Sequence, residues 1–173
     1  MKRTKKLAAA AILAALGVVI LLLGSVITVF DISAVAVASF LIMLSVIELG
    51  GAYPYLIWLV TGVLSTVLLP DKFAALLYLF FGGIYPIFKA MFERLHPAVT
   101  WVLKFSFFNT VLTVTVIVCN YVFKLPDTGL GFTWMVYLMC NTAFFFYDLA
   151  ATSIVTVYLI KLRRRLGLGN FFK

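Results

Sequence analysis

Charged residues are scarce in this 173-residue sequence. They make up 12% of it, against about 25% in soluble globular proteins, whereas hydrophobic residues make up 65%. A soluble domain of this size cannot keep so much apolar surface away from water. A disordered chain would be richer in charge and poorer in aromatic residues. The composition therefore predicts an integral membrane protein whose outer surface faces lipid.

Histidine and cysteine are almost absent as well. The sequence has one histidine, His96, and two cysteines, Cys119 and Cys140, which lie inside apolar runs without the spacing of a metal or redox site. It contains no GxSxG nucleophile motif, no carboxylate pair placed for acid–base chemistry and no GxxxxGK[ST] phosphate-binding loop. We therefore expect no catalytic activity, no metal and no cofactor. Any active transport would draw its energy from a partner or an ion gradient.

Long apolar runs are what the sequence has in place of these motifs. A helix needs about 20 apolar residues to cross a hydrocarbon layer of ~30 Å. The chain is expected to be one all-α domain, residues 1–173, folded as a compact bundle of six transmembrane helices. The first run is too long for the core of a secretory signal, about 7–15 residues. The expected spans cover about residues 7–30, 32–47, 54–69, 73–88, 99–123 and 132–160.

Basic residues predict the orientation of these spans. The net charge of +8 would suggest nucleic acid in a soluble protein, but here the charges flank apolar segments. With both termini in the cytoplasm, only Lys72 and Lys124 of the 14 Lys and Arg residues lie outside. This division follows the positive-inside rule. We therefore expect lipid, and no nucleic acid, as the surrounding partner.

An aspartate inside the last span is the most informative polar residue. Asp148 is expected to face the bundle interior, because an ionised carboxylate in the apolar layer costs several kcal/mol unless it is paired or hydrated. Together with Asn109, Asn120 and Asn141 it could line a polar substrate pocket. Alternatively, the four side chains make structural interhelical hydrogen bonds, with Asp148 paired to Lys104. The sequence leaves both alternatives open.

Glycine and proline predict two interruptions. Gly50 and Gly51 permit a tight turn between the second and third spans. The segment 82–86 breaks the fourth span, because its proline removes a backbone hydrogen bond, and such breaks are tolerated where they are buried or line a cavity. Tyr85 lies in this break and is a further candidate for substrate binding. Lys89 and Glu93, one turn apart beyond it, are expected to form a solvated charged face.

Alanines near the N-terminus form two pairs of small residues four positions apart. The pairs are Ala10 with Ala14 and Ala11 with Ala15. Residues at this spacing share a helix face, on which another helix can approach closely. The face either packs within the protein's own bundle or docks a partner subunit.

These features resemble the S components of energy-coupling factor (ECF) transporters. The resemblance includes six spans with both ends inside, a basic N-terminus leading into the alanines, and Asp31-Ile32-Ser33, which is similar to a loop of riboflavin-type S components. The following Ala34-Val-Ala-Val lacks the proline of that loop. Two expectations follow from the resemblance: a multi-pass protein of the bacterial cell membrane, and a pocket for a small, vitamin-like solute in its extracellular half.

The resemblance also implies partners. Ala10, Ala11, Ala14 and Ala15 would dock onto a transmembrane T component that is driven by two ATPases. The topology is also similar to that of MreD-like membrane proteins, which would imply a scaffold that binds partners and transports nothing.

Overall fold

The computed structural model describes residues 2–26, 28–118 and 134–163. These residues form helices joined by short turns and contain no strand, which confirms the all-α prediction for this part of the chain. The α-helices are α1 (Lys2–Ser25), α2 (Asp31–Glu48), α3 (Tyr53–Leu68), α4 (Lys72–Leu77), α5 (Tyr85–Phe92), α6 (Pro97–Ile117) and α7 (Trp134–Val157). They are supplemented by the 3₁₀ turn η1 (Thr28–Phe30) and the π-helical segments η2 (Tyr78–Gly82) and η4 (Tyr158–Leu162).

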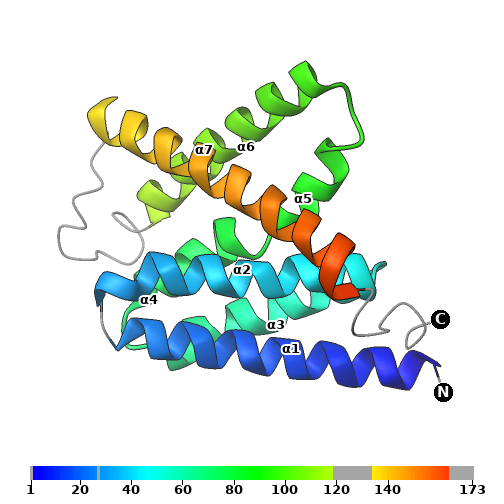
Figure 1. The fold of residues 1–173 in the computed structure, drawn as a ribbon. Helices are drawn as coiled ribbons and strands as arrows, with labels where there is room; N and C mark the ends of the chain where they lie inside the picture. The colour runs from blue at the N-terminus through cyan, green and yellow to red at the C-terminus, as the bar shows by residue number, and fades with distance from the viewer. Residues whose placement is uncertain (1, 27, 119–133, 164–173) are drawn as a thin grey trace.

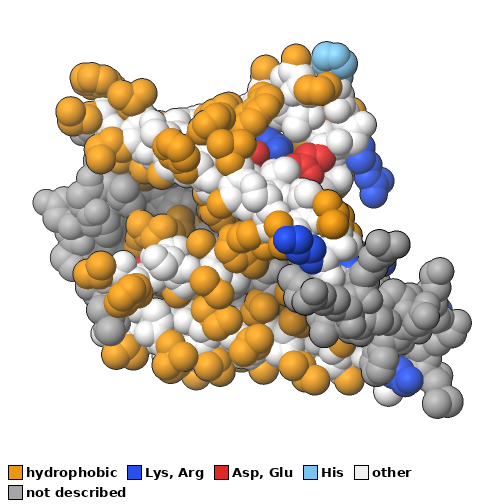
Figure 2. Space-filling model, viewed as in Figure 1, with side chains coloured by type: hydrophobic (Ala, Val, Ile, Leu, Met, Phe, Trp, Pro, Cys, Tyr) orange, Lys and Arg blue, Asp and Glu red, His pale blue; other side chains and the backbone are white. Residues whose placement is uncertain are grey.

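Five of the helical segments are long and apolar enough to cross a membrane. They are α1, α2, the continuous segment α4–η2–α5, α6, and α7 with η4. The sixth, α3, is apolar but has only 16 residues. Figure 2 shows hydrophobic side chains along the visible outer faces of α1, α6 and α7, where a soluble protein would place polar ones. The helices agree with the six apolar runs expected from the sequence.

The boundaries of the first run differ from expectation. We predicted a helix to residue 30, but α1 ends at Ser25 and the chain turns through η1 into α2. The chain reverses within these few residues and packs α1 on α2 so closely that a Cβ atom added at Gly24 would lie 2.2 Å from the Cβ atom of Ala34. The predicted span ends at residues 119–123 and 132–133 lie outside the described residues.

The helices form two groups around α2 (Figure 1). α1 packs against α2 and α3, while α2 also contacts α4, η2 and α5. α6 and α7 cross each other on the side of α2 away from α1. The first group has a core of small and aliphatic side chains that includes Ala10, Ala14, Leu21, Ala38 and Ile42. The second has an aromatic core built around Tyr85, Phe108 and Phe144.

The start of α1 and the end of η4 lie at the same end of the bundle (Figure 1). Lys6 Nζ donates to the Leu49 carbonyl at 3.1 Å, and Arg163 Nε lies 3.1 Å from Glu48 Oε1. We call this the terminal end, and the opposite one, where α2 and α4 begin, the distal end. The predicted tight turn at the terminal end is confirmed, because Gly50 and Gly51 have φ angles of +61° and +59°.

The predicted break in the fourth run is also confirmed. The helix widens into the π-helical turn η2, in which the Gly83 N–H donates to the Tyr78 carbonyl at 2.7 Å. The Leu79 carbonyl in the same turn accepts the indole N–H of Trp58 from α3 at 2.8 Å. α5 then starts at Tyr85, with a proline in its first turn. The break redirects α5 so that its residues reach α6 and α7.

Candidate functional site

Four charged side chains from three helical segments meet in an ion cluster, defined as Lys89, Glu93, Lys104 and Asp148. Asp148 is 1% exposed, Lys89 3% and Lys104 4%. Lys104 Nζ lies 2.8 Å from Asp148 Oδ2, and Lys89 pairs with Asp148 Oδ1. Glu93 Oε1 forms ion pairs with both ammonium groups, at 2.8 Å from Lys89 and 3.2 Å from Lys104. Each carboxylate therefore bridges both lysines, and the cluster carries no net charge.

Other polar groups complete the hydrogen bonding of the ion cluster. The hydroxyl group of Tyr85, a fully buried residue, donates to Asp148 Oδ1, and Lys89 Nζ donates to Thr152 Oγ1 at 2.8 Å. Lys104 Nζ also lies 5.3 Å from the centre of the Trp101 ring, within the range of a cation–π contact. A lysine has three N–H donors, and those of Lys89 have three side-chain acceptors here. The cluster is close to saturated, which favours a structural role.

Three sequence predictions are decided by this geometry. Asp148 faces the interior and pairs with Lys104, as one of the two alternatives stated. The prediction that Lys89 belongs to a solvated face was wrong, because the reoriented α5 turns this residue toward α7, and Glu93 alone stays 41% exposed. Lys104 had been counted among the cytoplasmic basic residues, whereas the structure places it inside the packed helices.

Two asparagines form a second interhelical contact. Asn109 Nδ2 donates to Asn141 Oδ1 at 2.9 Å, and Asn141 Nδ2 donates back to Asn109 Oδ1 at 3.0 Å. Each amide also donates to a carbonyl of its own helix, four residues earlier. The pair therefore joins α6 to α7 and is satisfied without a ligand. Asn120, the third predicted member of the pocket, and Cys119 lie outside the described residues.

The alanine face of α1 is divided between two environments. Ala10 and Ala14 are buried in the core with α2 and α3, and the Ala14 carbonyl accepts from Thr61 Oγ1 at 3.2 Å. Ala11 and Ala15 are exposed. Ala10 and Ala14 thus pack internally, and docking of a partner on α1 stays a prediction for the exposed pair.

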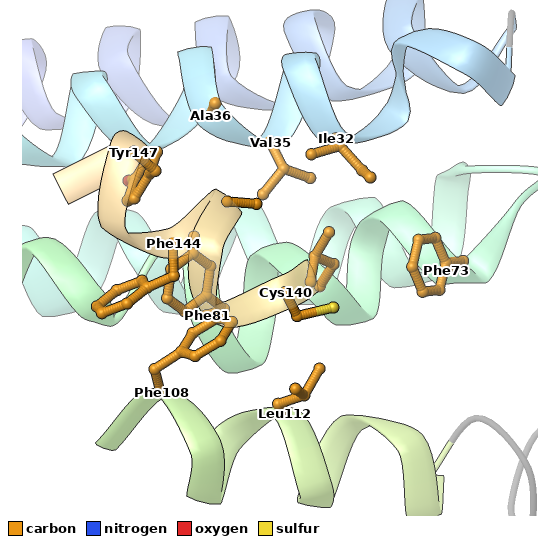
Figure 3. Close-up of a pocket in the computed structure, with 13 residues that line it drawn as sticks. Ile32, Val35, Ala36, Phe73, Phe81, Phe108, Leu112, Cys140, Phe144 and Tyr147 are labelled. Atoms are coloured by element: carbon orange, nitrogen blue, oxygen red, sulfur yellow. The ribbon is translucent and has the colours of Figure 1, made fainter. Parts of the chain in front are cut away.

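A cavity with apolar walls opens between the two groups of helices (Figure 3). Its volume is about 200 Å³, and α2, α4, η2, α6 and α7 contribute to its lining. Val35, Phe81, Phe108 and Phe144 are among the lining side chains. Tyr147 adds a hydroxyl group, which is hydrogen-bonded to Ser39. Since a dry cavity of about 150 Å³ holds a benzene ring, this apolar cavity can take one ring or a short alkyl chain.

Of the residues proposed from the sequence, those that the structure describes do not line the apolar cavity. None of Tyr85, Asn109, Asn141 and Asp148 is among its lining residues. No pattern in the sequence indicates this cavity, because its walls come from helices that are far apart along the chain and whose apolar residues look like ordinary lipid-facing or core positions. Cys140 is a lining residue and has no disulfide partner among the described residues.

A polar contact at the terminal end was not predicted from the sequence. Glu48, the last residue of α2, accepts from Tyr158 Oη at 3.1 Å besides its pairing with Arg163. This contact fastens η4 to α2 and so closes the bundle at the end opposite the apolar cavity.

The chain was compared with protein-family models, with curated protein sequences and with solved structures, and nothing matched in any of the three comparisons.

Proposed function

We propose that this chain is the solute-binding subunit of a membrane transporter, similar to an S component of an ECF transporter, and that the apolar cavity is its solute site. The observation that carries the proposal is the position of this cavity. It lies between the two helix groups, in the half of the bundle away from the terminal end. Clefts between helices of a bundle, lined mainly by apolar and aromatic side chains, are common sites for small ligands.

The proposal includes six spans in a cell membrane, with the terminal end in the cytoplasm. Lys6 and Arg163 mark that end, and basic residues favour the cytoplasmic side. The distal end, with Lys72, would then face outward, so the apolar cavity would be reached from outside. Cysteine-accessibility labelling of intact cells tests this: a cysteine at residue 72 should react with an impermeant reagent, and one at residue 94 should not.

Energy for transport would come from partners, namely a transmembrane T component and its ATPases. Ala11 and Ala15 offer a flat exposed strip on α1 for a partner helix. The same strip would serve an MreD-like scaffold, so docking alone does not separate the two functions. Ligand binding in the cavity separates them, because only the transporter function requires it.

A cavity-filling variant tests solute binding. Ala36 lines the cavity from α2, and Ala36→Phe places a ring inside it. Small molecules that co-purify with the protein in mild detergent should be found by mass spectrometry for the wild type and lost from this variant. Ala150→Phe is the matched control, because Ala150 is exposed on α7 and does not line the cavity.

An identical set of co-purifying molecules in the wild type and in Ala36→Phe, with both proteins folded, would contradict solute binding in this cavity. The scaffold function would then be the better account of the exposed alanines on α1.

A further inference from the structure

Aromatic side chains from four elements of the fold line the apolar cavity. Phe73 belongs to α4, Phe81 to η2 and Phe108 to α6, while α7 contributes Phe144 and Tyr147. Figure 3 shows Phe81, Phe108 and Phe144 grouped together and Phe73 apart from them, so that aromatic rings lie toward both ends of the cavity. No single helix makes this wall, and its rings come together only when the helices pack.

The grouped rings already meet in the geometry that aromatic pairs prefer. The Phe81 ring is inclined by 75° to the ring of Phe108 and by 71° to that of Phe144, with centres 5.4 and 5.9 Å apart. Such edge-to-face contacts are favourable because the face of an aromatic ring is negative and its edge is positive. A further aromatic ring in the cavity can join this arrangement, whereas a saturated group gains contact area alone.

Hydrogen-bonding side chains are almost missing from the walls. Of the 13 described residues that line the cavity, only Cys140 and Tyr147 carry a polar side-chain atom, and none is charged. The Tyr147 hydroxyl group is already hydrogen-bonded to the buried Ser39, and a thiol is a weak hydrogen-bonding group. An N–H, carbonyl or hydroxyl group of a ligand would therefore be buried here without a partner, and a charged group would cost still more.

The volume limits the part of a ligand that the cavity can enclose. It is about 200 Å³, and a dry cavity of about 150 Å³ holds benzene. The cavity thus has room for one benzene ring with about one or two methyl-sized substituents. A larger solute would keep the rest of its structure outside.

We propose that the apolar cavity recognises its solute by an uncharged benzene-type ring without hydrogen-bonding groups, so that the substrate class is a small alkyl-substituted aromatic compound whose polar groups, where it has any, stay outside the cavity. This inference rests on the proposed function, since it uses the same cavity. It separates the solute from a heterocycle with ring N–H and carbonyl groups, whose polar atoms would find no partners among the lining side chains.

Three matched probes test the proposal with the full chain in a non-ionic detergent. 4-Fluorotoluene has the proposed chemistry, 4-fluorophenol carries a hydroxyl group in place of the methyl group, and 1-fluoro-4-methylcyclohexane has a saturated ring. Binding is followed by ¹⁹F NMR. Because all three probes also enter detergent micelles, each affinity is referred to the probe concentration in protein-free micelles of the same detergent.

Cys140 reports whether a probe occupies the cavity itself, because it is a lining residue. In a Cys119→Ser background it is the only cysteine of the chain. Its alkylation by N-ethylmaleimide should slow when 4-fluorotoluene is bound. This readout, like the comparison of the three probes, needs no change in the cavity wall.

4-Fluorotoluene should bind the wild type at least about tenfold more tightly than 4-fluorophenol, as expected for a hydroxyl group buried without a partner. It should bind about 2- to 10-fold more tightly than the saturated probe, because of its contacts with the aromatic wall. Ala36→Phe should remove 4-fluorotoluene binding by filling the cavity. Ala150→Phe, at an exposed position outside the cavity, should leave it unchanged.

Three outcomes would overturn the proposal, and they differ in what else they affect. If 4-fluorophenol binds as tightly as 4-fluorotoluene, the cavity supplies a hydrogen-bonding partner, and solute binding there survives. If the saturated probe binds as tightly, the walls select apolar volume and not aromatic rings, and solute binding again survives. If no probe binds the wild type or slows the alkylation of Cys140, the cavity is only a gap in packing, and both this inference and the proposed function fail.

Discussion

The two groups of helices are held together by different means. α1, α2 and α3 approach closely through small side chains such as Ala14, Gly24 and Ala34. α5, α6 and α7 are joined by the ion cluster, by the asparagine pair and by stacked aromatic rings, including Phe108 on Phe144 at 4.4 Å. In lipid the hydrophobic effect does not drive helices together, so association depends on close packing or on polar contacts. In this chain the first group depends on close packing and the second on polar contacts.

This difference predicts where each group is sensitive. The first group should tolerate changes of polarity better than changes of size, because its contacts depend on the volume of each side chain. The second should respond most to the loss of a charge or a hydrogen bond. The apolar cavity lies where the two groups meet, and neither kind of contact fills it.

The largest effect is expected from Asp148→Leu. The substitution leaves the buried ammonium groups of Lys89 and Lys104 without this carboxylate, and breaking a buried pair in this way costs about 3–5 kcal/mol. Asp148→Asn should cost less, since the amide still accepts from Tyr85. Unfolding in mixed detergent measures the free energy of both variants.

Glu93→Gln is the matched control within the ion cluster. Glu93 contacts the same two lysines but is 41% exposed, so its loss should cost less than about 1 kcal/mol. Equal stability of wild type and Asp148→Leu would show that charge pairing does not hold the second group together.

Gly24→Ala tests the first group and should have an intermediate effect. The new Cβ atom would meet the Ala34 Cβ atom at 2.2 Å, and overpacking of this kind costs about 1–3 kcal/mol. Adding Ala34→Gly should restore much of the lost stability, because it removes the atom in conflict. Ala15→Leu, on the exposed face of α1, should change the thermal midpoint little.

If Gly24→Ala unfolds at the wild-type temperature, α1 and α2 have room to separate, and close packing is not what fixes the first group.

The smallest effect is expected for the asparagine pair. In a double-mutant cycle of Asn109→Leu and Asn141→Leu, the coupling energy should be about 0.6 kcal/mol, the average for interhelical hydrogen bonds in membranes. Coupling near zero would mean that the two amides contribute independently. A coupling energy as large as the effect of Asp148→Leu would contradict the expectation that the ion cluster stabilises the second group more than the asparagine pair does.

Much of the fold could be predicted from the sequence because lipid imposes simple rules. Apolar runs must form helices, and an aspartate within such a run must find a partner, which placed Asp148 in the interior and left its pairing with Lys104 as one of two alternatives. The break near Tyr85 was also predictable, because proline and glycine act on the backbone directly.

The remaining features depend on tertiary packing that no local pattern encodes. Lys89 and Glu93 are one turn apart at a helix end, which usually indicates a solvated pair, and only the redirected α5 brings Lys89 to α7. The early end of α1 goes with the reversal of the chain that brings Gly24 against Ala34 of α2. Predicting each of these features would have required the positions of the other helices.

The neutrality of the ion cluster has a consequence for the membrane potential. Moving one elementary charge across 100 mV changes the energy by about 2.3 kcal/mol. Two lysines and two carboxylates that move together experience no net force from this field. Inside a membrane, the ion cluster itself would therefore add no electrical work to a tilt of α5, α6 and α7. Asp148→Asn would leave one uncompensated positive charge and make the same motion voltage-dependent.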